Sequence, residues 1–149
     1  MSGLGSGPEN AGGSAAGLFH AAMLAALRAD AAFGGMLNGV FEGPAVQATA
    51  PYAELGELLA TDWGAKALAG MELRPAIIIR DRAEGPGRLH ALAAAADAAM
   101  VAIPAALGTP EGGAWQIASL ALLRSRIIRD GPGAWVAIVE HRVRIIQAN

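Results

Sequence analysis

The side chains that could carry out acid–base, nucleophilic or metal chemistry are few in this sequence and lie far apart. None of the three histidines has a carboxylate or a second histidine at the short spacing typical of metal ligands: His20, His90 and His141. The chain has no cysteine, which excludes disulfides, thiolate metal sites and cysteine nucleophiles. Its few serine and threonine residues lie in no nucleophile elbow or triad-like pattern. The sequence therefore predicts a protein that is not an enzyme and binds no metal.

The glycine-rich segments do not match a phosphate-binding loop. Such a loop needs a fixed glycine pattern between a strand and a helix, usually with a lysine, so that backbone amides surround the phosphate. Residues 3–13 and 85–87 lack this pattern. We interpret Gly85-Pro86-Gly87 as a chain reversal before a helix, and we expect no nucleotide or other cofactor.

A group of arginines near the C-terminus is the only charge asymmetry of note. A substantial share of the 11 basic residues lies at Arg124, Arg126, Arg142 and Arg144. One interpretation is a solvated sheet face with Glu140 as a partner, because surface ion pairs add little stability and need no function. The other is a docking surface for an acidic partner, where planar guanidinium groups make paired contacts that lysine cannot. The sequence leaves both interpretations open.

The segment Asp62-Trp63-Gly64-Ala65-Lys66 serves no catalytic or metal-binding purpose that its residues suggest. Aromatic residues make up only 5% of the chain, so each one matters to packing or to an interface. In one interpretation, Asp62 makes a local turn bond, Trp63 covers the edge of the core and Lys66 is solvated. In the other, the same residues lie between subunits, because an inserted tryptophan rimmed by charge is typical of a binding hot spot.

Length and composition bound the class of protein. A chain of 149 residues is long enough for one domain with one core. A net charge of -2 and a pI near 5.9 give no global basic field for binding polyanions. Residues 1–14 are rich in glycine and serine without the order of a secretory signal, so we expect a flexible tail before a single domain at 15–149. The apolar run 89–107 carries Asp97, which costs about 2.5–3.5 kcal/mol at the centre of a bilayer, and we expect no membrane span.

The spacing of apolar residues predicts two helices. Ser14 is a suitable N-cap for the first, in which Phe19, Met23 and Leu27 share one face. The second carries an apolar stripe over 89–107 at steps of three or four residues. Pro104 should kink or end it, because proline lacks the amide that would bond to the carbonyl four residues earlier.

The rest of the chain predicts strands. We expect a short strand within 40–51, strands over 52–60 and 71–80, and two long strands over 115–129 and 135–147, joined by a hairpin turn at Asp130-Gly131-Pro132-Gly133. Pro75 has no amide donor, so we place it at an edge or a bulge of its strand. In the last strand, His141 alternates onto the apolar face, and Glu140, Arg142 and Arg144 lie on the other. The predicted fold class is α+β: a mainly antiparallel sheet of about four strands, two helices packed on one face and a long C-terminal β-hairpin.

The order of these landmarks resembles the tail-completion, or tail terminator, proteins of long-tailed phages and gene transfer agents. Pro51-Tyr52 opens a strand, Asp62-Trp63-Gly64-x-Lys66 follows, and then come a strand, an alanine-rich helix and the terminal hairpin, so that the resemblance covers about 16–146. It implies an α+β subunit that assembles as a ring, commonly of six copies, on the last layer of a tail tube. The other side of the ring would meet the neck proteins of the head, and DNA would pass through the lumen without specific binding.

The resemblance also implies where the protein works and through which surfaces. It implies a place in the virion or virion-like particle, at the head-proximal end of the tail, after assembly in the bacterial cytoplasm. The interface candidates are Asp62, Trp63, Lys66, Arg124, Arg126, Arg142 and Arg144. We expect the arginines to face away from the lumen, because arginines lining it would slow the passage of DNA.

Two alternatives stay open beside the tail terminator. One is another neck or head-completion protein of the same kind of particle. The other is a small α+β ligand-binding or regulatory domain that shares the order of elements by coincidence. Such a domain would need convergent polar groups around a loop, and the glycine loops of this chain do not supply them.

Overall fold

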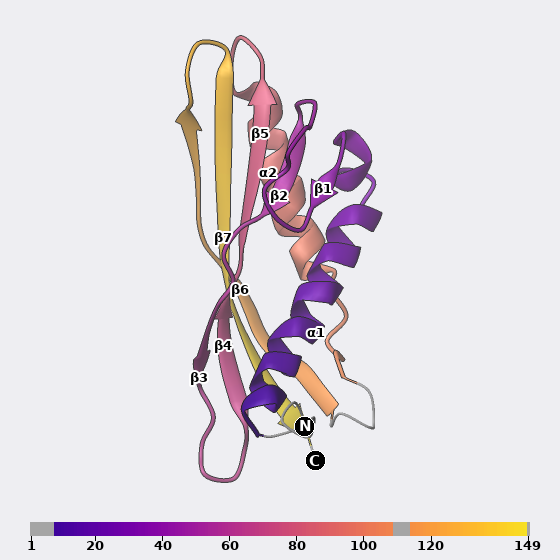
Figure 1. Cartoon of the computed structure of the whole chain (residues 1–149), viewed down its shortest axis with the longest axis vertical. Coiled ribbons are helices and arrows are strands. Elements are labelled where there is room, and N and C mark those ends of the chain that lie inside the picture. The colour runs from indigo at the N-terminus through magenta and orange to yellow at the C-terminus, as the bar shows by residue number, and fades with distance from the viewer. Residues whose placement is uncertain (1–7, 109–113, 149) are drawn as a thin grey trace.

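The computed structural model describes residues 8–108 and 114–148, and it has two layers (Figure 1). Helices α1 (Pro8–Ala29) and α2 (Gly87–Val101) lie on one face of a seven-stranded, mostly antiparallel sheet. A short 3-10 turn, η2 (Gly34–Met36), follows the first helix. The predicted α+β class, with both helices on one face and a long C-terminal hairpin, is confirmed.

The sheet is built around its longest central strand. The strands are β1 (Val40–Phe41), β2 (Tyr52–Leu55), β3 (Leu59–Asp62), β4 (Gly70–Arg74), β5 (Ala76–Arg82), β6 (Ala114–Arg129) and β7 (Ala134–Ala148). Along one side of β7 runs β6, and along the other lie β5 and β4, end to end. The sheet is completed by β2 and β1 beyond β5, and by β3 beyond β4.

The sheet has seven strands and not the expected four or so, because the short strand predicted within 40–51 forms β1 and two of the longer predicted strands are each divided in two. The strand predicted at 52–60 breaks after Leu55, and its halves, β2 and β3, lie in different parts of the sheet. The strand predicted at 71–80 breaks at Pro75, which has no amide to donate, although its carbonyl oxygen accepts a bond of 3.2 Å from the amide of His141. Pro75 therefore lies inside the sheet, between β4 and β5, and not at an edge.

The first helix begins earlier than expected. It starts at Pro8, a residue suited to the first helical turn, and Ser14 lies within it and does not cap it. The predicted inward face is confirmed, since Phe19, Met23 and Leu27 are buried. Of the segment expected to be flexible, residues 1–7 lie outside the described part of the chain, so that expectation stays a prediction.

The second helix ends before its apolar stripe does. It stops at Val101, and its last turn tightens as the amide of Ile103 bonds to the carbonyl oxygen of Met100 at 3.2 Å. Pro104 then prevents continuation, as expected. Ile103 and Leu107 still pack on the core, but from the segment after the helix.

The core fills the space between the sheet and the helices. Alternate residues of β7 point into it, including Ala137, Val139, Val143 and Ile145, opposite helix residues such as Phe19 and Leu92. Each fully buried leucine, isoleucine or phenylalanine contributes about 1.5–3 kcal/mol of transfer free energy. The predicted alternation places the remaining residues of β7 on the other side of the sheet, which we call the open face. Among the described residues, neither helix covers it.

Candidate assembly surface

The Asp62-Trp63-Gly64-x-Lys66 segment lies at the tip of the β3–β4 hairpin. In Figure 1 this hairpin forms the end of the sheet opposite the β6–β7 turn. The amide of Trp63 bonds to the carbonyl oxygen of Gly70 at 3.0 Å, and Ala65 and Leu68 bond to each other across the turn at 2.9 and 3.1 Å. A Cβ atom at residue 64 would lie 2.5 Å from the carbonyl oxygen of Leu68, so the close approach of the two strands requires glycine there.

The ring of Trp63 lies on the outside of the molecule beneath an arginine of the C-terminal hairpin. The guanidinium carbon of Arg144 is 4.9 Å from the centre of the ring, and Trp63 remains 40% exposed. A cation over an indole at an exposed site contributes about 0.5–1 kcal/mol. The structure therefore joins the two sets of predicted interface residues, the Trp63 segment and the hairpin arginines.

Glu72 links Arg144 to a second arginine. One of its carboxylate oxygens accepts a bond of 3.1 Å from Arg144 Nε, and the other accepts one of 3.1 Å from Arg74 Nη2. The hydrogen bond from Arg144 is the main cause that lowers the pKa of Glu72, with a further contribution from Arg74. We call Trp63, Glu72, Arg74 and Arg144 the Trp–Arg cluster.

Asp62 and Lys66 flank the cluster as exposed charges. Within residues 8–108 and 114–148, neither side chain makes a hydrogen bond or an ion pair, so the turn bond considered for Asp62 is not formed there. Both charges are thus available to a partner at the tip of the hairpin.

The four hairpin arginines share the open face but differ in their partners. In the β6–β7 register, Arg124 lies opposite Glu140 and pairs with it, which raises the pKa of Arg124. Arg126 and Arg142 have no carboxylate partner among the described residues, and the Nε atom of Arg142 is buried without a hydrogen-bond partner. The solvated ion-pair interpretation accordingly fits Arg124 and Arg144, whereas Arg126 and Arg142 keep their charges uncompensated.

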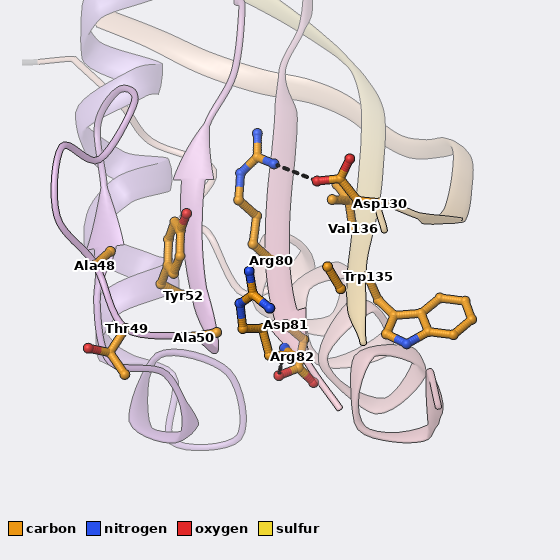
Figure 2. A pocket seen from close by; sticks show the side chains of 11 residues that line it. Ala48, Thr49, Ala50, Tyr52, Arg80, Asp81, Arg82, Asp130, Trp135 and Val136 are labelled. Atoms are coloured by element: carbon orange, nitrogen blue, oxygen red, sulfur yellow. Dashed lines mark hydrogen bonds and ion pairs between the residues drawn. The ribbon is translucent and has the colours of Figure 1, made fainter. Parts of the chain in front are cut away.

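The hollows of the open face include two larger ones. One, of about 420 Å³, is lined by residues of both hairpins, including Leu59, Arg74, Leu123, Arg124 and Glu140. It connects the Trp–Arg cluster with the hairpin arginines. The other, of about 520 Å³, lies near the β6–β7 turn and is shown in Figure 2.

Three of the charged groups that line the second hollow, Arg80, Asp81 and Asp130, take part in ion pairs. The guanidinium of Arg80 is 3.8 Å from Asp130 (Figure 2). It is also 3.0 Å from the carboxylate of Glu54. Nearby, the carboxylate of Asp81, which is 3% exposed, accepts a bond of 3.0 Å from Arg88 Nε, and this bond raises the pKa of Arg88. Asp81 and Arg88 tie the first turn of α2 to β5, which is a structural task.

One buried polar pair was not apparent from the sequence. The ring of His141 is fully buried, and its Nε2 atom is 2.7 Å from Asp97 Oδ1 of α2. Its Nδ1 atom has no hydrogen-bond partner in the structure. The structural role expected for His141 is thus that of a link between helix and sheet. Only the apolar alternation around His141, and the single acidic residue in an alanine-rich helix, could have suggested it.

The described residues contain no group of three or more histidine, aspartate or glutamate side chains arranged to hold a metal ion. Over the same part of the chain, no helix combines the length and the apolar character needed to cross a bilayer.

The fold and this surface define a class: a two-layer α+β domain with one helical face and one uncovered, arginine-bearing sheet face next to an exposed tryptophan. The sequence matches the family described as Tail completion protein gp17 over residues 21–146, and the chain belongs to that family. It is thus a structural protein of a phage-like tail.

A solved structure shows the same fold. It is a chain from the virion of a native gene transfer agent particle, with a TM-score of 0.68 and 24% sequence identity. The alignment covers 89% of this protein and 98% of that chain. A search of the curated proteins gave no match.

Proposed function

We propose that this protein is the tail terminator of a phage or gene transfer agent particle. Copies of the chain form a ring, of six subunits, on the last layer of the tail tube. The other side of the ring provides the surface to which the neck proteins of the head bind. Membership of the tail completion family and the shared fold with a chain of a gene transfer agent virion support this proposal.

The observation that carries the proposal is the position of Trp63. It lies outside the core on an exposed hairpin, it is held in place by Arg144, and the free charges of Asp62 and Lys66 stand beside it. An ordered aromatic ring loses little conformational entropy on binding, and a tryptophan rimmed by charge is typical of a binding hot spot. A domain that worked alone would gain little by exposing this group.

The arginines of the open face are better suited to contact with a protein partner than to a position on the wall of the lumen. Arg126 and Arg142 carry uncompensated charge, and such groups on the wall of a channel would bind the phosphates of passing DNA. We therefore propose that the open face points away from the lumen, toward an acidic surface of a tube or neck protein, and that DNA passes without specific binding. This task requires no catalytic group and no cofactor.

The test is the substitution Trp63→Ala in cells that produce particles. We expect an intact monomer and a loss of tails joined to heads, scored by electron microscopy. Val101→Ala is the matched control, because it removes an exposed apolar side chain, 70% exposed, from the helical side. Normal particles with Trp63→Ala, at unchanged stability, would show that Trp63 is no interface anchor.

Electron microscopy of the labelled native protein distinguishes a tail terminator from another neck or head-completion protein. A terminator should be found at the ends of tail tubes even when heads are absent. A head-completion protein should instead stay with the heads. Labelled protein bound only to heads would therefore move the assignment to that alternative.

A further inference from the structure

The outer edges of the sheet are not equally available for pairing. The outward carbonyl oxygen of Val40 in β1 accepts two bonds from the guanidinium of Arg28, at 3.0 and 2.8 Å, so α1 closes this edge. By contrast, β3 pairs only with β4, and in the described part of the chain no other segment bonds to its outer side. The sheet is therefore open at β3.

The opposite edge, β6, is open along most of its length. Its first residues are covered, because the amide of Ile117 bonds to the carbonyl oxygen of Ala105 and the amide of Leu107 bonds to that of Trp115, both at 2.8 Å. Over 118–129, β6 pairs with β7 on one side and with no other described segment on the other. A long unpaired strand edge is a template for a strand from another chain.

Both open edges expose apolar side chains. On β6 these are Leu122, Leu123 and Ile128, with exposed fractions of 45%, 43% and 42%. On β3 it is Leu59, at 49%. Apolar side chains at an unpaired edge are unusual in a protein that stays monomeric.

The charges of the two edges are opposite in sign. Residues 118–129 contain Arg124, Arg126 and Arg129 and no carboxylate, whereas residues 57–62 contain Glu57 and Asp62 and no basic residue. Two β6 edges would repel each other, and so would two β3 edges. A β3 edge and a β6 edge attract, which favours contact between different patches on successive copies.

The strand directions permit this contact. Both β6 and β4 are antiparallel to β7, and β3 is antiparallel to β4, so β3 runs opposite to β6. When copies are related by rotation about an axis along the strands, β3 of one copy meets β6 of the next in the antiparallel sense. The helical layers then stay on the same side of the wall, and a contact of this type closes into a ring.

We infer that β3 of one subunit adds to the free edge of β6 in the next subunit, so that the sheet continues from copy to copy. Rotation about that axis keeps each strand at its own level, so Thr61 of one copy then lies level with Ser119 of the next. This inference rests on the ring of the proposed function and identifies its subunit contact.

Cross-linking tests the contact, and the absence of native cysteine makes the chain suitable for it. Within one subunit β3 and β6 are separated by β4 and β7, a distance of about 14 Å at three strand spacings. A bismaleimide shorter than this can therefore join Thr61→Cys to Ser119→Cys, two positions at the same level and on the same face, only between copies. We expect the double variant, in purified particles, to give a ladder of bands up to the size of the ring, and neither single variant to give one.

The outcomes of this experiment distinguish a failure of the β3–β6 contact from a failure of the proposed tail terminator function. A ring of normal mass without a ladder, or dimers from Ser119→Cys alone, overturns the β3–β6 contact and leaves the tail terminator proposal standing. A chain that is monomeric in solution and absent from tail ends overturns both.

Discussion

At the scale of the residue, Trp63 and Arg144 hold each other on the surface, at 4.9 Å, and Glu72 fixes the arginine from its other side. Alternation along β7 placed Arg142 and Arg144 on the face away from the core, and this prediction is confirmed. Strand periodicity could not show that Arg144 covers Trp63, because that contact depends on the pairing of β4 with β7 and of β3 with β4. It could not separate the paired from the unpaired arginines either, since their partners come from other strands.

Glu72 gives a pH test of the Trp–Arg cluster. Its folded-state pKa lies below the ordinary value of 4.5, because Arg144 and Arg74 favour the carboxylate. The contribution of Glu72 to stability is therefore fully present above the unfolded value and is lost as the pH falls through the lower, folded value. In thermal unfolding, Glu72→Gln should be less stable than the native chain at neutral pH. The difference should shrink as the pH falls from about 4.5 and disappear below the lower, folded-state pKa. A difference that stays constant with pH would contradict the ion pairs.

Substitution of Arg142 tests whether this residue contributes to assembly and not to the stability of the folded chain. Its buried Nε atom lacks a partner, and leaving such a group unsatisfied costs about 1–3 kcal/mol. Arg142→Met keeps a long apolar stem and removes that group, so urea unfolding should show equal or higher stability. The joining of heads to tails should decrease. Arg124→Met is the control for a locally paired arginine, and an equal effect of both variants on joining would contradict a special role for Arg142.

At the scale of the element, the sequence was most informative where turn residues determine the ends of the two flanking strands. The β6–β7 hairpin was predicted to within about a residue at each end, because Gly131 and Gly133 permit the positive φ angles of 115° and 68° that its turn uses. The prediction was poorer where one run of strand-like residues serves two strands. Periodicity continues across Gly56 and Pro75, and only the three-dimensional register shows that the chain changes partners there.

The docking of α2 on β7 can be tested through Asp97. Its carboxylate is the partner of the fully buried His141 ring, whose other nitrogen is already unsatisfied. Asp97→Ala should destabilise the protein by about 1–3 kcal/mol in urea unfolding, because both ring nitrogens then lack partners. Ala95→Ser, a polar change elsewhere on the same helix at a partly buried position, is the control for a local effect on the helix. A native-like stability of Asp97→Ala would show that the pair contributes nothing to docking.

At the scale of the whole molecule, the chain has three different surfaces. The helical layer covers the core, the open face carries the arginines, and the two free sheet edges carry opposite charge. One surface for each kind of neighbour is what a subunit between copies of itself, a tube and a head requires. The ring, its size and its partners stay proposals, because they depend on contacts that a single chain does not contain.

The most direct test of the tail terminator proposal is electron microscopy of particles produced without this protein. The account predicts heads separate from tails, with tube ends that carry no terminal ring, and restoration of joined particles when the native chain is supplied. Normal mature particles with heads joined to tails in its absence would contradict the account.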